Sequence, residues 1–238
     1  MAIIMLRLDK YLADMGIGTR TEVKKYIRQG KVKVDGIVVK TPEKKVDVQS
    51  QDVLYMDQPI GYEDFEYFML NKPAGFVSAT TDEKDKTVIE LITDRKRKDL
   101  FPVGRLDKDT EGLLLITNDG ELAHRLLTPK KHVDKTYYAK IKGIVTDEDV
   151  KAFKEGVSIG KDEMTMPADL EILISDEISE IKLTIQEGKF HQVKRMFLAV
   201  GKEVTYLKRL SMGPLVLDEN LAHGAYRPLT KEELEQLC

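Results

Sequence analysis

One stretch near the middle of the chain, residues 102–117, reads PVGRLDKDTEGLLLIT and joins a charged loop to an apolar run. The loop carries three acids at alternate positions: Asp107, Asp109 and Glu111. The four apolar residues at 113–116 predict a short buried strand, because turn residues bound them on both sides. The acids therefore belong to a loop that enters the core of a sheet, which is a common position for catalytic side chains.

This acidic loop allows three interpretations. It resembles the start of an EF-hand calcium loop, but the twelfth position is Asn118 instead of Glu, and apolar residues occupy the intervening ligand positions. The calcium interpretation therefore fails on spacing. A solvated turn and a loop that holds one catalytic carboxylate both remain open from these residues alone.

The composition is that of a soluble globular protein, with 238 residues and a net charge of −3. No apolar run approaches the roughly 18 residues of a membrane span. The single cysteine is Cys238, so we expect neither a disulfide framework nor a thiolate metal site. The four histidines show no spacing typical of metal ligands, and we expect a cytoplasmic protein that makes no contact with a membrane.

The charge is distributed unevenly along the chain. Residues 1–59 hold 11 Lys/Arg and 8 Asp/Glu, a net charge of +3, so the remaining residues carry a net charge of −6. We expect two domains, residues 1–59 and residues 60–238, with a polar linker around residues 57–66. The basic first domain indicates an anionic partner.

The order of elements in the first domain is informative. A helix is expected from Leu8 to Met15, and Thr19 with Glu22 forms a capping box that opens a second helix. A hairpin with Asp35-Gly36 at its turn follows. Basic residues gather on the second helix and the next strand: Arg20, Lys24, Lys25, Arg28, Lys31 and Lys33. They predict a phosphate-binding surface. Residues 5–56, including Arg7, resemble the S4 RNA-binding domain.

The second domain mixes strands and helices without a regular βαβ repeat, so we predict the α+β class. Strands are expected at 67–71, 113–116, 135–142, 181–185 and 204–210, and helices at 121–127, 146–156, 193–200 and after Thr230.

Four segments in this order resemble the pseudouridine synthases that carry an S4 domain. They are YFMLNKPAG at 67–75, GRLDKDTEG at 104–112, KTY at 135–137 and EGKFHQVKRM at 187–196. The resemblance implies a mixed, mainly antiparallel sheet with flanking helices and a central cleft. It also implies an isomerase that breaks the N1–C1′ bond of a uridine in RNA, rotates the base and joins C5 to C1′, with no cofactor and no metal.

The resemblance assigns a role to each motif. Asp107 would be the catalytic nucleophile, whether it attacks C1′ or C6 or assists a glycal route. Lys194 would pair with it, although Lys194 and Arg195 could also be a solvated helix flank. Tyr137 would stack on the flipped base, although a strand tyrosine is more often core. Arg105 would assist base flipping.

The other motif residues receive lesser roles. We interpret Asp109 as a carboxylate that structures the loop. His191 is expected to be positional. Gly104 and Gly112 are expected to let the loop approach the RNA backbone.

Within the family, the YFMLNKP opening at 67–73, the short start of the S4 domain and the YRPLT ending at 226–230 most resemble enzymes that act on small-subunit (16S) rRNA. We expect that rRNA as the partner, within a ribosomal assembly intermediate, and a monomeric protein. The alternatives are a large-subunit rRNA synthase of the same subfamily and a non-catalytic S4-type RNA-binding assembly factor.

Overall fold

The computed structural model describes residues 4–128, 131–160 and 162–237, so Cys238 lies outside the described residues. The chain forms two compact units. The first contains the residues up to Glu66 together with Asp94–Leu100, and the second contains Tyr67–Thr93 and the chain from Phe101 onward. The domain boundary expected after residue 59 stays a prediction. In the described part of the chain, no helix is long and apolar enough to cross a membrane.

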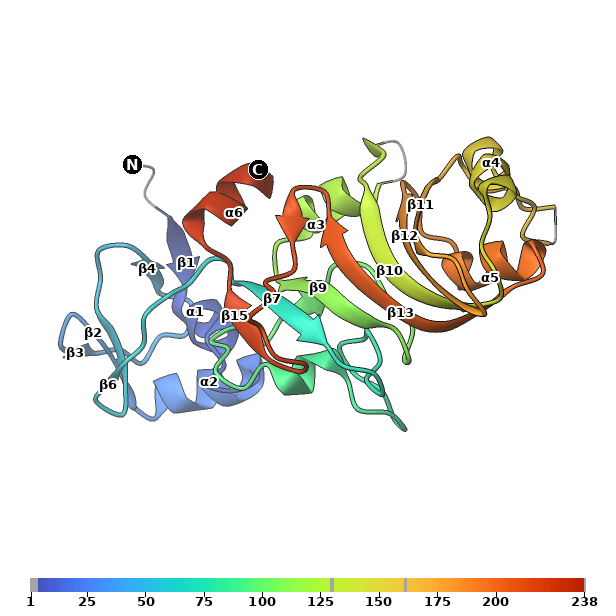
Figure 1. Cartoon of the computed structure of the whole chain (residues 1–238). Helices are drawn as coiled ribbons and strands as arrows, with labels where there is room; N and C mark the ends of the chain where they lie inside the picture. The colour runs from blue at the N-terminus through green and yellow to red at the C-terminus, as the bar shows by residue number, and fades with distance from the viewer. Residues whose placement is uncertain (1–3, 129–130, 161, 238) are drawn as a thin grey trace. The chain divides into compact units, whose positions relative to one another are not determined.

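The first unit combines two short helices with two small sheets (Figure 1). The helices are α1 (Leu8–Asp14) and α2 (Arg20–Arg28). Strands β1 (Met5–Arg7) and β4 (Lys45–Asp47) form one sheet. The second sheet has the order β3-β2-β5-β6, from strands Ile37–Val38, Val32–Val34, Val53–Tyr55 and Gln58–Pro59.

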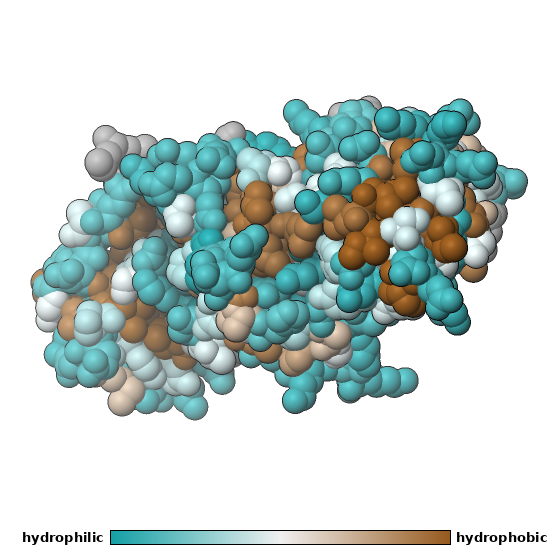
Figure 2. Space-filling view, in the orientation of Figure 1, coloured by the Kyte–Doolittle hydropathy of each residue, from teal (hydrophilic) through white to brown (hydrophobic). Residues whose placement is uncertain are grey.

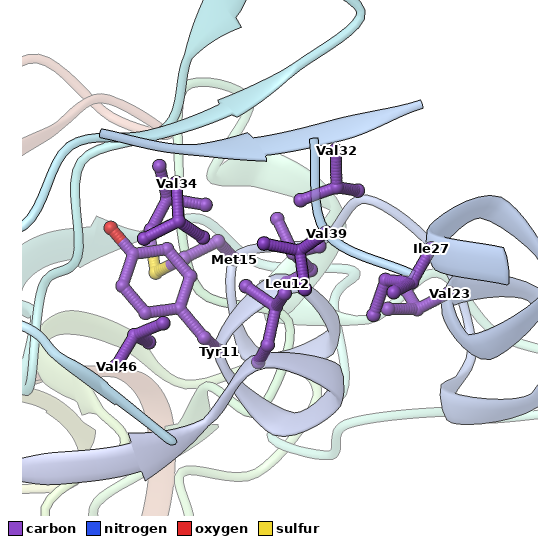
Figure 3. Close-up of a cluster of buried hydrophobic side chains, with 11 residues drawn as sticks. Tyr11, Leu12, Met15, Val23, Ile27, Val32, Val34, Val39 and Val46 are labelled. Carbon is purple, nitrogen blue, oxygen red and sulfur yellow. The ribbon is translucent and has the colours of Figure 1, made fainter. Parts of the chain in front are cut away.

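Figure 3 shows how the helices and strands of the first unit meet. Leu12 from α1 and Val23 and Ile27 from α2 point toward Val32, and all four are completely buried. The capping box predicted at the start of α2 is confirmed, because the side chains of its first and fourth residues each accept a hydrogen bond from the other's backbone. The hairpin turn is also confirmed: Asp35 and Gly36 have φ angles of 51° and 78°, and both must be positive in a type I′ turn.

The second unit is built on one nine-stranded sheet. Its order is β11-β12-β10-β13-β9-β7-β15, from strands Asp169–Ile174, Ile178–Ile185, Lys135–Lys142, Glu203–Met212, Glu111–Thr117, Tyr67–Lys72 and Tyr226–Pro228. The short strands β8 (Phe101–Pro102) and β14 (Leu215–Val216) pair with β9 and β13. The pairs along this order are antiparallel except for β9 with β13, so the α+β, mainly antiparallel class is confirmed.

Helices flank this sheet (Figure 1). They are the 3₁₀ helix η1 (Val88–Leu91), α3 (Gly120–Leu127), α4 (Asp147–Glu155), α5 (Gln192–Ala199) and α6 (Lys231–Leu237). Helices α4 and α5 pack on β11 and β13, and Phe153 of α4 meets Phe197 of α5 with ring centroids 5.0 Å apart. The apolar residues of these two helices therefore cover one end of the sheet.

Strand β9 lies inside the sheet, as the opening stretch predicts, and Leu113 to Ile116 are completely buried. The parallel pairing with β13 brings Gly112 very close to Arg209. A Cβ atom at Gly112 would lie 2.2 Å from the carbonyl oxygen of Arg209, and the φ of Gly112 is 99°. The expectation that Gly112 serves contact with the RNA backbone is therefore wrong, because this glycine accommodates a neighbouring strand.

Four strands of the sheet were not expected from the sequence: the short strands β8 and β14, and the longer strands β11 and β15. Of these, β11 and β15 lie at the edges of the sheet. In β11 the alternation of exposed and buried residues stops at its end, where Leu173 and Ile174 are both exposed, and Ile178 at the start of β12 is exposed as well. Figure 2 shows apolar side chains gathered over this end of the sheet, on a face that is otherwise mainly hydrophilic.

Candidate active site

The acidic loop, residues 106–110, is fixed from beneath by one lysine. Lys72, the last residue of β7, is completely buried. Its Nζ lies within 3.3 Å of four carbonyl oxygens, those of Pro73, Asp107, Lys108 and Thr110. Three ammonium N–H groups are therefore shared among these carbonyls, and those of Asp107 and Lys108 also accept backbone N–H groups from Thr110 and Gly75. Ser78 adds a second anchor, because its hydroxyl donates to the carbonyl of Leu106 and accepts from the N–H of the same residue.

Burial disfavours the charged form of Lys72. Burial lowers the pKa of Lys72 to about 8, although the charges of Asp109, Asp107 and Glu111 oppose this shift. The acids of the loop thus help to keep the ammonium protonated, and the ammonium holds the loop in place. Sequence reasoning missed this residue. A lysine that ends an apolar strand and precedes a proline was the available signal.

Lys194 joins two of the loop acids. Its Nζ lies 3.1 Å from Oδ2 of Asp107 and 2.6 Å from Oδ1 of Asp109. Val193, Met196 and Phe197 are buried, so α5 presents Lys194 on its flank. The alternative of a solvated helix flank does not describe Lys194, which is 25% exposed and paired with two carboxylates.

The shared lysine changes the ionisation of this cluster. Burial alone would raise the pKa of Asp109, but the hydrogen bond and charge of Lys194 outweigh it and hold that pKa below its usual range. Burial alone would lower the pKa of Lys194, but the hydrogen bonds that it donates to Asp109 and Asp107 reverse that effect and raise it. Lys194 is therefore a cation at neutral pH. The interpretation of Asp109 as a loop-structuring residue is incomplete, because its carboxylate bonds to a helix of another segment.

A pocket opens above these residues. Arg105, Asp107, Tyr137 and Lys194 all line a cavity of about 70 Å³, so the structure brings together the four site residues expected from the sequence. This cavity adjoins a cleft of about 1010 Å³ that shares Arg105, Asp107 and Lys194 and extends along residues 74–79. The volume of this cleft is at the upper end of the range for ligand pockets, so the cleft has room for a nucleotide and its neighbours. Tyr137 is only 8% exposed, yet its ring faces the cavity, so it is both a core residue and a lining residue.

His191 stands beside the carboxylate pair. Its Nε2 lies 3.6 Å from Oδ1 of Asp107, and its φ angle of 47° is unusual for a residue other than glycine. It is the N-cap of α5, and its ring stacks on Phe190. Among the described residues, no group of three or more His, Cys, Asp or Glu side chains is arranged to hold a metal ion.

The basic surface of the first unit contains an acid that the sequence reasoning did not weigh. Asp9 is completely buried, and its carboxylate lies 2.9 Å from Arg7, 3.0 Å from Arg20 and 3.9 Å from Lys24. Burial would raise the pKa of Asp9, but the hydrogen bonds from Arg7 and Arg20 outweigh it and lower that pKa. Three of the expected RNA-binding cations are thus held in place by one carboxylate.

The other four expected cations have different surroundings. Lys33 pairs with Asp57 at 2.6 Å, and the Nζ of Lys31 lies 5.3 Å from the ring centroid of Tyr26. Lys25 and Arg28 are exposed on α2, and within the described chain neither has an ion-pair partner. These two side chains are therefore the most available to an RNA phosphate.

Comparison with known proteins agrees with this geometry. The RNA pseudouridylate synthase family matches residues 66–199, and the S4 domain matches residues 6–52. The Bacillus subtilis (strain 168) protein YtzG, named as an uncharacterized RNA pseudouridine synthase, is 51% identical over 98% of both chains. Ribosomal small subunit pseudouridine synthase A is 42% identical in Haemophilus influenzae, over 98% of this chain and 99% of the relative, and 40% identical in Escherichia coli K12, over 96% and 98%.

A solved structure is similar over nearly the whole chain. The crystal structure of a pseudouridylate synthase matches with a TM-score of 0.69 and 41% identity, and the match covers 98% of this chain and 100% of that one. The expected family is therefore confirmed by the matching sequence and by the fold. This chain belongs to the S4-domain-containing RNA pseudouridine synthases, isomerases that act on RNA.

Proposed function

We propose that this enzyme isomerises a specific uridine of small-subunit (16S) rRNA to pseudouridine and that Asp107 is its essential catalytic residue. The observation that carries the proposal is the position of Asp107. Its carboxylate lies 26% exposed at the meeting point of the cavity and the cleft, 3.1 Å from Lys194. A uridine that leaves its stack can reach this carboxylate, while the loop behind it is held by Lys72.

Each neighbouring side chain has a role in this proposal. Lys194 keeps a positive charge 3.1 Å from Asp107, where it orients the carboxylate that would act as the nucleophile. Tyr137 offers an aromatic side chain to the flipped base, because it lines the cavity. Arg105 is exposed at the rim of the same cavity, where it can contact a phosphate or fill the vacated position in the RNA.

The target rRNA is inferred from relatives. Proteins 40–42% identical over nearly the full chain are named ribosomal small subunit pseudouridine synthases. The proposal extends that substrate to this chain and places the reaction in a ribosomal assembly intermediate, with a monomeric enzyme in the cytoplasm. The exposed cations of α2 support the binding of structured RNA.

The test is a reaction on purified ribosomal RNA with site mapping. Wild-type protein is expected to introduce one pseudouridine into small-subunit rRNA, mapped by carbodiimide treatment and primer extension. Asp107→Asn is expected to bind the RNA with wild-type affinity and to leave no detectable pseudouridine, because an amide is a poor nucleophile. Wild-type rates in Asp107→Asn would refute the catalytic role. Modification of large-subunit rRNA alone would refute the substrate, and a wild type inactive both on purified rRNA and on small-subunit assembly intermediates would favour the assembly factor.

A further inference from the structure

Phe190 lies at the rim of the active-site cleft with most of its ring in solvent. Its side chain is 71% exposed, and it lines the same cleft as Asp107 and Lys194. Single exposed apolar residues are common on protein surfaces. Phe190 differs from such scattered residues, because it lies at the active-site cleft and hydrogen bonds support its backbone on both sides.

The turn that carries Phe190 is rigidly built. The N–H of Lys189 donates to the side chain of Gln192 at 2.9 Å, and Gln192, only 4% exposed, donates to Glu187 at 2.9 Å. Arg195 donates to the carbonyl oxygen of Phe190 at 3.2 Å. Because both sides of the residue are hydrogen-bonded, the backbone holds the phenyl ring outward instead of letting it fold back onto apolar surface.

The ring of Phe190 also has a fixed orientation. It stacks on His191 with ring centroids 3.8 Å apart and an interplanar angle of 17°. His191 itself lies 3.6 Å from Asp107 and adopts a left-handed backbone conformation that turns its side chain in this direction. The two rings therefore form a stack that begins beside Asp107, and the 71% exposure of Phe190 leaves its outer face open.

We propose that the outer face of Phe190 stacks on an unpaired nucleobase adjacent to the target uridine, and thereby positions the RNA and contributes to substrate choice. This inference rests on the proposed function. A uridine that flips into the site leaves its neighbours without one stacking partner. Aromatic side chains commonly supply such a partner in single-stranded RNA, because every base offers a flat apolar face.

The charge around the ring favours RNA over an apolar protein surface. Arg105 is exposed and lines the same cleft as Phe190, whereas Lys189 near the base of the turn is paired with Glu187 at 3.0 Å. An exposed cation in the same cleft as an exposed aromatic ring matches the alternation of phosphate and base along an RNA strand.

The test compares Phe190→Leu with Phe190→Trp on an RNA fragment that carries the mapped uridine. Base–aromatic stacking predicts that Phe190→Leu raises KM about 5- to 100-fold and leaves kcat within about threefold of wild type. Phe190→Trp, which keeps a flat ring, is expected to retain a low KM. The matched control is Leu198→Ala, since Leu198 is also 71% exposed, belongs to α5 and lines neither cavity.

Two further RNAs, each abasic at one neighbour of the target, complete the test. On the RNA that lacks the stacked base, wild type and Phe190→Leu are expected to have equal KM values, while on the other RNA the difference persists. An unchanged KM in Phe190→Leu, a difference that survives on both abasic RNAs, or a defect confined to ribonucleoprotein substrates would overturn the inference. Failure of the proposed function would look different, because wild-type enzyme would then form no pseudouridine on any RNA.

Discussion

Asp9 in the first unit and Lys194 in the second are each surrounded by side chains of opposite charge. Around Asp9, the cations Arg7, Arg20 and Lys24 outnumber the acid. Around Lys194, the acids Asp107 and Asp109 outnumber the cation. The two clusters are alike in construction and opposite in sign.

This difference corresponds to two parts of an RNA molecule. A cluster with excess positive charge attracts phosphates and gives affinity without regard to sequence. A cluster with excess negative charge repels phosphates, so a nucleotide can reach it only with its base or sugar in front. Under the proposed function, the first unit would hold RNA broadly, while the second would admit one turned-out nucleoside.

Removal of the cation at the centre of the acidic cluster is expected to have the largest effect. Lys194→Met should lower kcat about 10²- to 10³-fold, because Asp107 loses the ion pair that positions its carboxylate. Asp109→Asn should cost less, since Lys194 remains beside Asp107. Single-turnover rates on the mapped RNA measure both. A larger loss in Asp109→Asn would mean that Asp109, not Asp107, is the main partner of this lysine.

The second prediction concerns pH and Lys72. Its pKa in the folded protein is about 8, below the ordinary value of 10.5, so between these values the unfolded chain binds more protons. The free energy of unfolding should therefore rise with pH over this window in wild type relative to Lys72→Met. Denaturant unfolding at several pH values gives this difference, in which other lysines cancel. A flat difference from pH 8 to 10.5 would show that Lys72 is not desolvated. Lys72→Met should also reduce kcat, because the acidic loop loses the hydrogen bonds that join it to the end of β7.

The central acid of the basic cluster gives a third prediction, in which stability again rises with pH but over an acidic window. Asp9 has a lowered pKa in the folded state, so its contribution is present above its ordinary pKa of 3.8 and is lost as pH falls through the folded value. Asp9→Asn should destabilise the first unit by about 1–3 kcal/mol at pH 7. Hydrogen exchange of amides in α1 and α2 reports this directly. The wild-type advantage should shrink below pH 3.8, and an advantage independent of pH would contradict the ion-pair explanation.

The smallest effect is expected at the unpaired cations. Lys25→Ala/Arg28→Ala should weaken RNA binding and reduce the slope of log affinity against log salt by about two units. Lys151→Ala/Lys154→Ala is the matched control, because it removes the same charge at the same spacing from the exposed side of α4. Equal slopes for the two double variants would remove α2 from the RNA interface.

The sequence predicted the elements whose patterns are local. The capping box of α2, the Asp35-Gly36 turn and the buried strand after Gly112 all follow from neighbouring residues, and all are present. The edge strands β11 and β15 were missed, because edge strands show weak alternation and take their structure from partners far along the chain.

The candidate site was likewise predicted only in part. Motif resemblance named Asp107, Lys194, Tyr137 and Arg105, and these residues do line one cavity. The pairing of Asp109 with Lys194 spans 85 positions, and Lys72 reaches carbonyls more than 30 positions away. Such contacts depend on the tertiary fold. The same limit applies to Asp9, whose partners belong to the next helix and to a preceding strand.

Asp94–Leu100 belongs to the first unit although the residues on both sides belong to the second. Arg97 in this segment is 4% exposed, pairs with Asp99 at 2.6 Å and donates to Tyr62 at 3.2 Å. The chain therefore passes between the units three times, after Glu66, Thr93 and Leu100. A single cut in the chain therefore cannot produce an RNA-binding fragment and a catalytic fragment that each keep all the residues of their unit. The first unit of this enzyme thus alternates with the second along the chain, and a transplanted N-terminal fragment would lack Asp94–Leu100, a segment of its own compact unit.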